Sequence, residues 1–324
     1  MAEVIPIGPR TEPGRCRGIT TLGTRCRNRA AESGYCTIHL RQAPEARPQD
    51  GLGRALDFVR RRLTGDYEID EFGFDTELTE EVFNRLARFL HETWWRVDWV
   101  GMEHVPSEGA ALLVSNHAGT LPWDAVVLKF GILDKHPAHR HVRLLAADLV
   151  FRTPFIGPLA RKSGNTLATH EDAFRLLQRG DLLGVMPEGY KGVGKLFKDR
   201  YKLQRFGRGG FIELALRARV PIIPVSIVGS EEIYPLLYKS KTLARLLGLP
   251  YFPITATFPW LGPLGAIPLP SKWIVEFGEP IVTDELDEDA WQDALTVFDM
   301  NDRVREVIQQ TLYRNLMVRR SVWY

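Results

Sequence analysis

The chain has 324 residues, of which 44% are hydrophobic, so it is long enough for one large domain or two smaller ones with a sizeable core. Its formal net charge is only +2, so the charge indicates no nucleic-acid partner and none is expected. The sequence has neither a secretory signal pattern nor an apolar run of the roughly 18 residues that a membrane-spanning helix needs. We therefore expect a cytoplasmic protein.

All the cysteines lie in the first forty residues, in the pattern C-x9-C-x9-C-x2-H formed by Cys16, Cys26, Cys36 and His39. Three thiolates and one imidazole are a ligand set that tetrahedral structural zinc takes. The stretch also resembles a small Cys3His motif appended to varied bacterial and phage proteins. We predict a structural zinc-binding unit over residues 1–40 and a linker over 41–52. The alternative is three free cysteines in a disordered tail.

Residues 53–99 are predicted to form an amphipathic helical segment. From Leu78 to Trp99, apolar residues recur on one side of a helix that also carries arginines, and the segment contains Trp94, Trp95 and Trp99 near its end. Tryptophan at the end of a basic amphipathic helix is typical of a segment that lies in a membrane interface. The alternative is a helix that packs on a sheet with its tryptophans in the core.

From residue 100 to 282, short apolar runs alternate with helical patterns. The apolar runs include "ALLVSN", "VRLLAAD", "DLLGVMPEG", "PIIPVSIVG" and "WIVEFG". Strands that alternate with helices of about ten residues predict an α/β domain with a mixed or parallel sheet flanked by helices. A long helix is expected over roughly 287–317, within a C-terminal region 283–324.

The stretch "LLVSNHAGTLPWDA" ends a predicted strand at a sharp turn that carries His117. Asp124 follows seven positions later, at the start of a predicted helix. A carboxylate there can accept a hydrogen bond from one imidazole nitrogen and leave the other nitrogen as a base. We therefore assign His117 as a candidate general base and Asp124 as the group that orients it.

A second strand ends in "MPEG", followed by a turn rich in glycine and lysine. Residues 189–195 spell G-x4-G-K, the core of a phosphate-binding loop. The next residue is Leu196, where such a loop needs the serine or threonine that holds magnesium. A nucleotide-binding loop is therefore disfavoured.

In that order, "NHAGTLPWD", "MPEG" and "VPIIPVSIVG" resemble the glycerolipid and lysophospholipid acyltransferase family, over about residues 100–282. The resemblance implies a glycerol-3-phosphate acyltransferase-like fold. It also implies transfer of an acyl group from acyl-CoA or acyl carrier protein to a lipid hydroxyl, with His117 as the base. By family analogy, the groups that position the substrate are Asn116, Pro187, Glu188 and Gly189. A lipid acceptor implies a protein that is peripheral on the inner face of the membrane.

The chain departs from the family pattern at two informative places. Six residues separate His117 from Asp124 where the family commonly has four. The family's arginine that holds an acceptor phosphate is missing from "GNTLATHED", although Arg161 and Lys162 lie a few residues earlier as substitutes. The stretch "RFGRGGFIELALRARVPIIPVSIVG" also looks like the diacylglycerol acyltransferase branch. These features weaken a lysophosphatidate acceptor and leave room for a neutral lipid hydroxyl, so the expected acceptor is a glycerolipid, either a lysophospholipid or a diacylglycerol-like lipid.

A basic run follows the second motif, and it is either an anion-binding surface or a solvated loop. Its members are Lys191, Lys195, Lys198, Arg200, Lys202, Arg205 and Arg208. Two other functions compete with acyl transfer. A thioesterase or lipid esterase would use the same site with water as acceptor, and a non-enzymatic zinc adaptor would only bind lipid.

Overall fold

The computed structural model describes residues 51–323, so the predicted zinc ligands Cys16, Cys26, Cys36 and His39 lie outside the described residues. The chain divides into two compact units, Met1–Tyr67 and Glu68–Tyr324. In the first unit, helix α1 (Gly51–Thr64) begins within the stretch expected to be a linker. The guanidinium of Arg62 lies 4.3 Å from the ring centroid of Tyr67, just beyond the end of this helix.

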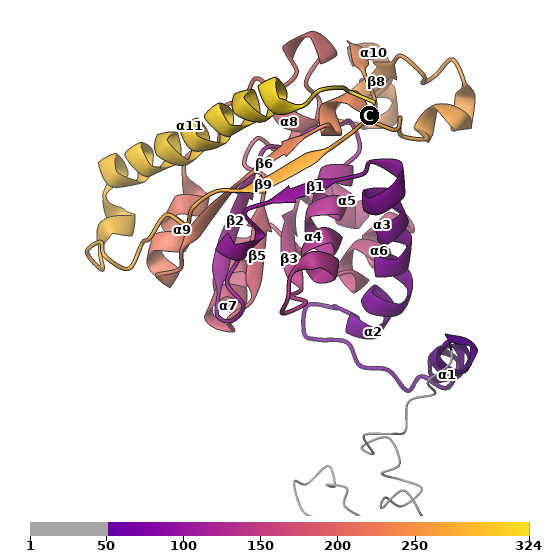
Figure 1. The fold of residues 1–324 in the computed structure, drawn as a ribbon, viewed down its shortest axis with the longest axis horizontal. Helices are drawn as coiled ribbons and strands as arrows, with labels where there is room; N and C mark the ends of the chain where they lie inside the picture. The colour runs from indigo at the N-terminus through magenta and orange to yellow at the C-terminus, as the bar shows by residue number, and fades with distance from the viewer. Residues whose placement is uncertain (1–50, 324) are drawn as a thin grey trace, which may run out of the picture. The chain divides into compact units, whose positions relative to one another are not determined.

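The second unit is built on a seven-stranded sheet in the order β1-β9-β6-β2-β5-β3-β4 (Figure 1). The strands are β1 (Asp98–Val100), β2 (Ala111–Ser115), β3 (Val142–Ala146), β4 (Asn165–Leu167), β5 (Leu182–Val185), β6 (Ile222–Val228) and β9 (Ile274–Phe277). Strands β2 to β6 run parallel to one another, whereas β9 pairs with β6 in the antiparallel sense and carries β1 alongside it. The predicted α/β class with a mostly parallel sheet is confirmed.

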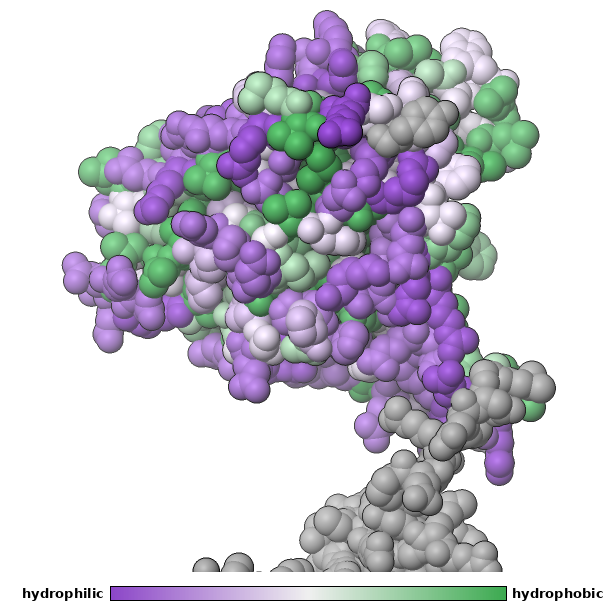
Figure 2. Space-filling model, in the orientation of Figure 1, coloured by the Kyte–Doolittle hydropathy of each residue, from purple (hydrophilic) through white to green (hydrophobic). Residues whose placement is uncertain are grey.

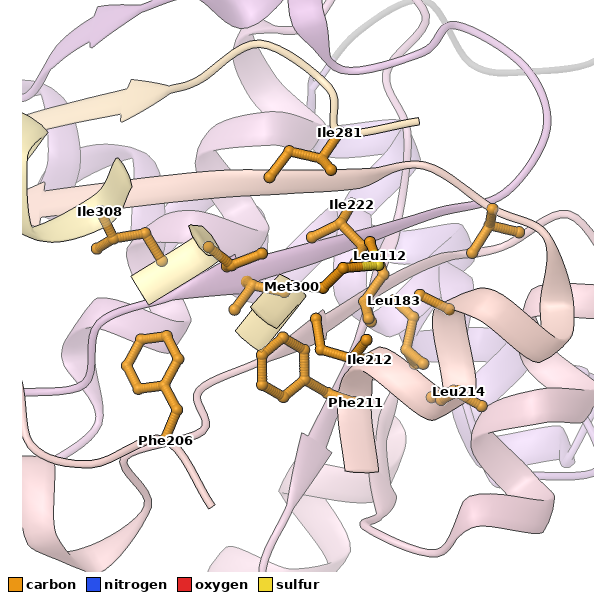
Figure 3. Packing of buried hydrophobic residues seen from close by; sticks show 14 of the residues in the cluster. Leu112, Leu183, Phe206, Phe211, Ile212, Leu214, Ile222, Ile281, Met300 and Ile308 are labelled. Atoms are coloured by element: carbon orange, nitrogen blue, oxygen red, sulfur yellow. The ribbon is translucent and has the colours of Figure 1, made fainter. Parts of the chain in front are cut away.

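Helices cover both faces of this sheet. The elements after β2 are α4 (Trp123–Lys135), α5 (Asp148–Arg152), α6 (Ile156–Lys162), α7 (His170–Gln178), α8 (Tyr190–Val193), α9 (Gly210–Ala218) and α11 (Ala294–Val318). Short 3-10 turns are η4 (Met102–His104), η5 (Phe197–Asp199), η6 (Ser230–Glu232), η7 (Gly262–Ala266) and η8 (Ala290–Gln292). Alternate residues of β2 point to opposite faces. Leu112 belongs to a cluster with residues of α7, α9 and α11, and Figure 3 shows it with Phe211 and Ile212 of α9 and Met300 of α11. Leu113 packs with residues of α4.

The predicted helix from Leu78 to Trp99 is shorter than expected. Helix α2 (Thr76–Leu78), π-helical η2 (Thr79–Phe83), α3 (Asn84–Arg88) and π-helical η3 (Phe89–Trp94) follow one another, and Trp99 lies on β1. Trp95 is fully buried and stacks on Trp273 with ring centroids 4.7 Å apart. The Trp94 indole donates a hydrogen bond to the carbonyl of Pro268 at 3.0 Å. Trp95 therefore belongs to the core, and Trp94 and Trp99 are partly buried against the same cluster. This packing agrees with the alternative interpretation, a helix that packs on the sheet.

The long C-terminal helix begins at Ala294, later than the expected residue 287, because Asp293 caps it by accepting a hydrogen bond from the backbone N–H of Leu295. Its buried side chains join the same core cluster as α7 and α9. The hydroxyl of Ser226 on β6 donates to the carbonyl of Ile308. The C-terminal helix is thus part of the sheet domain and not a separate region.

Between β6 and β9 the chain leaves the main sheet. It forms a two-stranded antiparallel sheet from β7 (Leu236–Ser240) and β8 (Phe252–Thr255), with α10 (Lys241–Leu247) between them. We name residues 233–269 the β7–β8 lobe. Within residues 51–323, none of the helices combines the length and the apolar character needed to cross a membrane.

Candidate active site

His117 and Asp124 are in direct contact at the carboxyl end of β2. The Nδ1 atom of His117 lies 2.8 Å from Oδ2 of Asp124, and the same oxygen accepts a hydrogen bond from the backbone N–H of Ala118 at 2.7 Å. Asp124 is fully buried in the first turn of α4, whereas 14% of the His117 side chain is exposed. A carboxylate at Nδ1 favours the neutral tautomer that carries its proton on that nitrogen. Nε2 is the ring nitrogen that takes no part in this contact.

The two extra residues between His117 and Asp124 are absorbed by a tight turn. Gly119 and Thr120 both have positive φ, at 93° and 62°. A Cβ atom on Gly119 would lie 2.7 Å from the carbonyl oxygen of Ser230, so only glycine fits this close approach. The longer spacing bends the loop and does not separate the pair.

Asn116 holds the end of β2 against β6. Its side-chain amide donates to the carbonyl of Ile227 at 3.0 Å, and its side-chain oxygen accepts from the N–H of Ile227 at 2.8 Å. Asn116 is fully buried. Both ends of its amide are therefore used inside the fold, which makes it a support for the neighbouring histidine and not a group that meets substrate.

Glu188 connects the second motif to the first. One carboxylate oxygen accepts the backbone N–H of His117 at 2.9 Å, and the other accepts the backbone N–H of Gln204 at 2.6 Å. Glu188 is buried, whereas Pro187 before it and Gly189 after it are half-buried. The family resemblance predicts that Glu188 positions the acceptor. In the structure its contacts instead fix the backbone from which the imidazole projects.

Lys195 is buried beside Glu188, although it belongs to a run of mostly exposed basic residues. Its ammonium lies 3.0 Å from Oε1 of Glu231 and 3.4 Å from Oε2 of Glu188. Burial raises the pKa of Glu231 to about 7, and the charge of Lys195 opposes that rise. With its ammonium held in this ion cluster, Lys195 does not act as the lysine of a nucleotide loop. It is therefore neither an anion-binding nor a solvated loop residue.

Gly192 brings α8 against the loop that carries His117. A Cβ atom at this position would lie 2.6 Å from the carbonyl oxygen of His117 and 2.7 Å from Cβ of Glu188. Sequence reasoning missed Gly192 and Glu231. The glycine-rich turn after "MPEG" contains Gly192, but this turn was considered only as a possible phosphate-binding loop.

The Acyltransferase family model matches residues 96–228, which include His117, Asp124 and Glu188. An uncharacterized protein from Mycobacterium tuberculosis is 54% identical to the chain over 283 residues, which cover 86% of this chain and 79% of the relative. A Gallus gallus protein described as "DGAT1/2-independent enzyme synthesizing storage lipids" is 29% identical over 192 residues, 59% of this chain and 54% of that protein. The chain therefore belongs to the same family as the Mycobacterium tuberculosis protein, and it contains an Acyltransferase domain over residues 96–228.

The solved structure of the 1-acyl-sn-glycerophosphate (LPA) acyltransferase PlsC from Thermotoga maritima matches with a TM-score of 0.51 and 17% identity, over 82% of this chain and 90% of that one. This similarity shows a shared fold. A second family model, "Domain of unknown function (DUF5763)", matches residues 14–50, which include the four predicted zinc ligands. The Acyltransferase match shows that the chain is an acyltransferase.

The acyltransferase does not bring Arg161 and Lys162 to His117. Both residues end α6, just before the amino end of β4, whereas His117 follows the carboxyl end of the parallel strand β2. Three strand spacings separate β4 from β2, which is roughly 14 Å across the sheet. The guanidinium of Arg161 lies over the ring of Phe151, 4.6 Å from its centroid. The position of the missing arginine is occupied by Thr169, whose hydroxyl caps α7.

Within residues 51–323, one group of side chains has ligand atoms close enough to hold a metal ion, namely His91, Glu92 and Asp134. Ion pairs with Lys135 and Arg88 already neutralise the carboxylates of this group. Burial lowers the pKa of His91 to about 4. The group is thus a charge-compensated contact between η3 and α4 of the acyltransferase.

Proposed function

We propose that this enzyme transfers a fatty acyl group from the thioester of acyl-CoA or acyl carrier protein to the hydroxyl of a glycerolipid, with His117 as general base. Nε2 of His117 removes the hydroxyl proton as the oxygen attacks the thioester carbonyl. The carbon–sulfur bond then breaks, and the proton on Nε2 passes to the leaving thiolate. The single observation that carries this proposal is the 2.8 Å contact between Nδ1 of His117 and Oδ2 of Asp124.

Direct attack by the lipid hydroxyl fits the composition of the chain. No cysteine occurs after Cys36, and no G-x-S-x-G nucleophile motif occurs anywhere in the sequence. A positioned base typically contributes a factor of about 10² to 10⁴ to a rate. The remaining stabilisation falls to groups that bind the oxyanion.

We propose a neutral glycerolipid, such as a diacylglycerol-like alcohol, as the acceptor. A phosphate monoester is usually held by an arginine, whose planar fork matches phosphate oxygens in pairs. Thr169 stands where the family has that arginine, and Arg161 packs on Phe151 instead. The similarity to a protein named as an enzyme that synthesizes storage lipids supports the same class of acceptor.

The test is mass spectrometry of the lipids formed when the purified protein meets acyl-CoA and a panel of acceptors: diacylglycerol, lysophosphatidylcholine and lysophosphatidate. We expect an acylated neutral or zwitterionic lipid at least as abundant as acylated lysophosphatidate. Free fatty acid as the main product in every mixture would make the protein a thioesterase or esterase. Neither transfer nor thioester cleavage would favour a lipid-binding adaptor.

Arg161→Ala provides a second test of the acceptor. Because Arg161 lies by the amino end of β4, the variant should keep the same ratio of products from lysophosphatidate and diacylglycerol as the wild type. His170→Ala should also leave this ratio nearly unchanged. A preference for lysophosphatidate that disappears in Arg161→Ala would mean that Arg161 holds the phosphate, and the neutral acceptor would then be wrong.

A further inference from the structure

The β7–β8 lobe exposes an unusual amount of apolar surface. Its exposed large hydrophobic residues are Leu237, Tyr238, Leu243, Leu246, Leu247, Leu249, Trp260, Leu261, Leu264 and Ile267. Leu246 on α10 is 79% exposed and Trp260 is 70% exposed. In Figure 2, green and pale residues gather over α10 and the loop that follows β8. Contiguous apolar surface of this kind marks a site of contact with a partner or a membrane.

The charge of the lobe is one-sided. The chain contains 40 aspartate and glutamate residues, yet residues 233–269 contain none. The lobe carries three exposed basic residues, Lys239, Lys241 and Arg245. Such a surface can place its apolar side chains among lipid acyl chains while its basic side chains contact negatively charged headgroups. That description fits a bilayer with anionic headgroups.

The aromatic residues of the lobe favour the same partner. Trp260 and Tyr238 are both exposed, and rings with one polar atom are enriched at the level of lipid headgroups. Leu237 lies on β7, and the other exposed leucines lie on α10 and in the segments before and after β8, which project from the main sheet (Figure 1). Projecting apolar loops suit shallow insertion into a fluid surface.

The lobe is joined to the loop that carries the catalytic pair. The hydroxyl of Tyr251 donates to the carbonyl of Thr120 at 3.2 Å, and the Trp123 indole donates to the hydroxyl of Tyr234 at 3.1 Å. Thr120 and Trp123 both lie between His117 and Asp124. Leu121, in the same loop, is exposed. A membrane bound by the lobe would therefore lie near the loop that carries His117.

We propose that the β7–β8 lobe docks the protein on an anionic bilayer. Trp260, Leu264 and Leu246 enter the boundary between headgroups and acyl chains, and the lobe's three basic residues contact the acidic headgroups. The proposal deepens the proposed function, on which it rests for the reason to reach a lipid, and it replaces the helix before β1 as the expected membrane contact.

The first experiment is co-sedimentation of the full chain with vesicles of phosphatidylcholine, with and without phosphatidylglycerol, in the absence of acyl donor. Wild type should bind the anionic vesicles and lose binding as salt increases. The double variant Trp260→Asp/Leu264→Asp should bind at least about tenfold more weakly. The matched control is Leu295→Asp on α11, where an apolar side chain 66% exposed lies outside the lobe; it should bind as wild type does.

Replacing Lys239, Lys241 and Arg245 by alanine should weaken binding to anionic vesicles by about fivefold per cation and leave binding to neutral vesicles unchanged. A milder variant guards against misfolding. Brominated lipid should quench part of the tryptophan fluorescence of the wild type, and Trp260→Phe should lose that part. Equal quenching in both proteins would contradict insertion of Trp260.

Acyl transfer separates this proposal from the proposed function. The docking variants should keep wild-type transfer to a short-chain acceptor dispersed in water and lose transfer to an acceptor embedded in vesicles. Wild type that binds no anionic vesicle, or lobe variants that bind as well as Leu295→Asp, would overturn the docking surface even if acyl transfer is measured. The docking proposal would also be overturned if the protein forms a stable dimer that the lobe substitutions dissociate while vesicle binding is unchanged. The lobe would then be a dimer interface.

Discussion

The carboxylate of Glu188 accepts the backbone N–H of His117 at 2.9 Å, across 71 residues of sequence. The two motifs of the acyltransferase are thus physically one unit. The second carboxylate oxygen of Glu188 accepts the N–H of Gln204, so the residue also ties the histidine loop to the segment before α9. This arrangement makes Glu188 a positioning residue, since it acts through the backbone of His117.

Glu188→Gln should lower kcat by about tenfold to a hundredfold, because one end of the amide would present N–H groups to the N–H of its partner. KM for the acceptor should change much less, since Glu188 does not touch the substrate in this scheme. Steady-state kinetics measures both. The exposed Glu103→Gln is the control. A large rise in KM with unchanged kcat would show that Glu188 binds the acceptor directly.

His117→Ala should lose acyl transfer by a factor of about 10² to 10⁴, the range for a positioned base. Asp124→Asn should also lose at least about 10²-fold, because an amide does not fix the proton on Nδ1. Rates are measured by thiol release, and thermal unfolding checks that both variants fold. If His117→Ala retains more than about a tenth of the activity, another group acts as the base.

Gly192→Ala should reduce activity by about tenfold or more, because its new Cβ atom would lie 2.6 Å from the carbonyl oxygen of His117 and displace the loop. Gly207→Ala is a matched control, since a Cβ atom there would meet nothing within 4 Å. Rates of both variants are compared with their melting temperatures. Equal activity of the two variants would mean that the loop relaxes freely.

Glu231 should make the free energy of unfolding depend on pH. Burial raises its pKa from 4.5 to about 7, so the folded state holds the proton more tightly than the unfolded chain. Its stabilising contribution is complete below pH 4.5 and is lost as pH rises to 7. Glu231→Gln should lack this contribution. The difference in free energy of unfolding between variant and wild type should therefore change by roughly 3 kcal/mol between pH 4.5 and 7.

Urea unfolding at several pH values measures this effect, with the exposed Glu306→Gln as control. His91 acts in the opposite direction over an overlapping range, because burial lowers its pKa from 6.5 to about 4. The effect of Glu231 is therefore obtained by subtracting the free energy of unfolding of the wild type from that of the variant at each pH, because the contribution of His91 cancels. A difference that stays constant between pH 4.5 and 7 would mean that Lys195 keeps Glu231 ionised throughout.

The purified protein should contain about one zinc per chain, because three cysteines and one histidine fill a tetrahedral site. Cys26→Ser should release the metal, measured by elemental analysis, and Ser33→Ala should retain it. Deletion of residues 1–45 should leave acyl transfer largely intact, since the catalytic residues all lie beyond residue 100. Metal-free wild type would contradict the zinc unit.

The sequence predicted the sheet class and the contact between His117 and Asp124, because both depend on local order along the chain: a strand, a turn and the start of a helix. It did not predict the partners of Lys195, because its contact with Glu231 joins residues 36 positions apart. A lysine among exposed basic residues gives no local sign of burial. Trp95 was ambiguous for a different reason, since an aromatic residue suits both a core and a membrane interface.

Arg161 shows a third kind of error. Closeness in sequence to the missing arginine made it a candidate, but α6 ends three strands away from His117. Only the order of strands in the sheet could have excluded it, and that order is set by tertiary packing. The same holds for Glu188, whose motif was recognised while its contact with the backbone of His117 was not.

The position of Asp124 in the first turn of α4 has a consequence for sequence patterns that identify relatives of this enzyme. Asp124 reaches His117 because it lies at the start of a helix anchored in the core, with Oδ1 accepting the N–H of Ala125 at 2.8 Å. The loop before it spans six residues here, and the two side chains still meet at 2.8 Å. A sequence search that demands four residues between the histidine and the aspartate would therefore discard working enzymes of this design. A pattern that allows four to six would retain them.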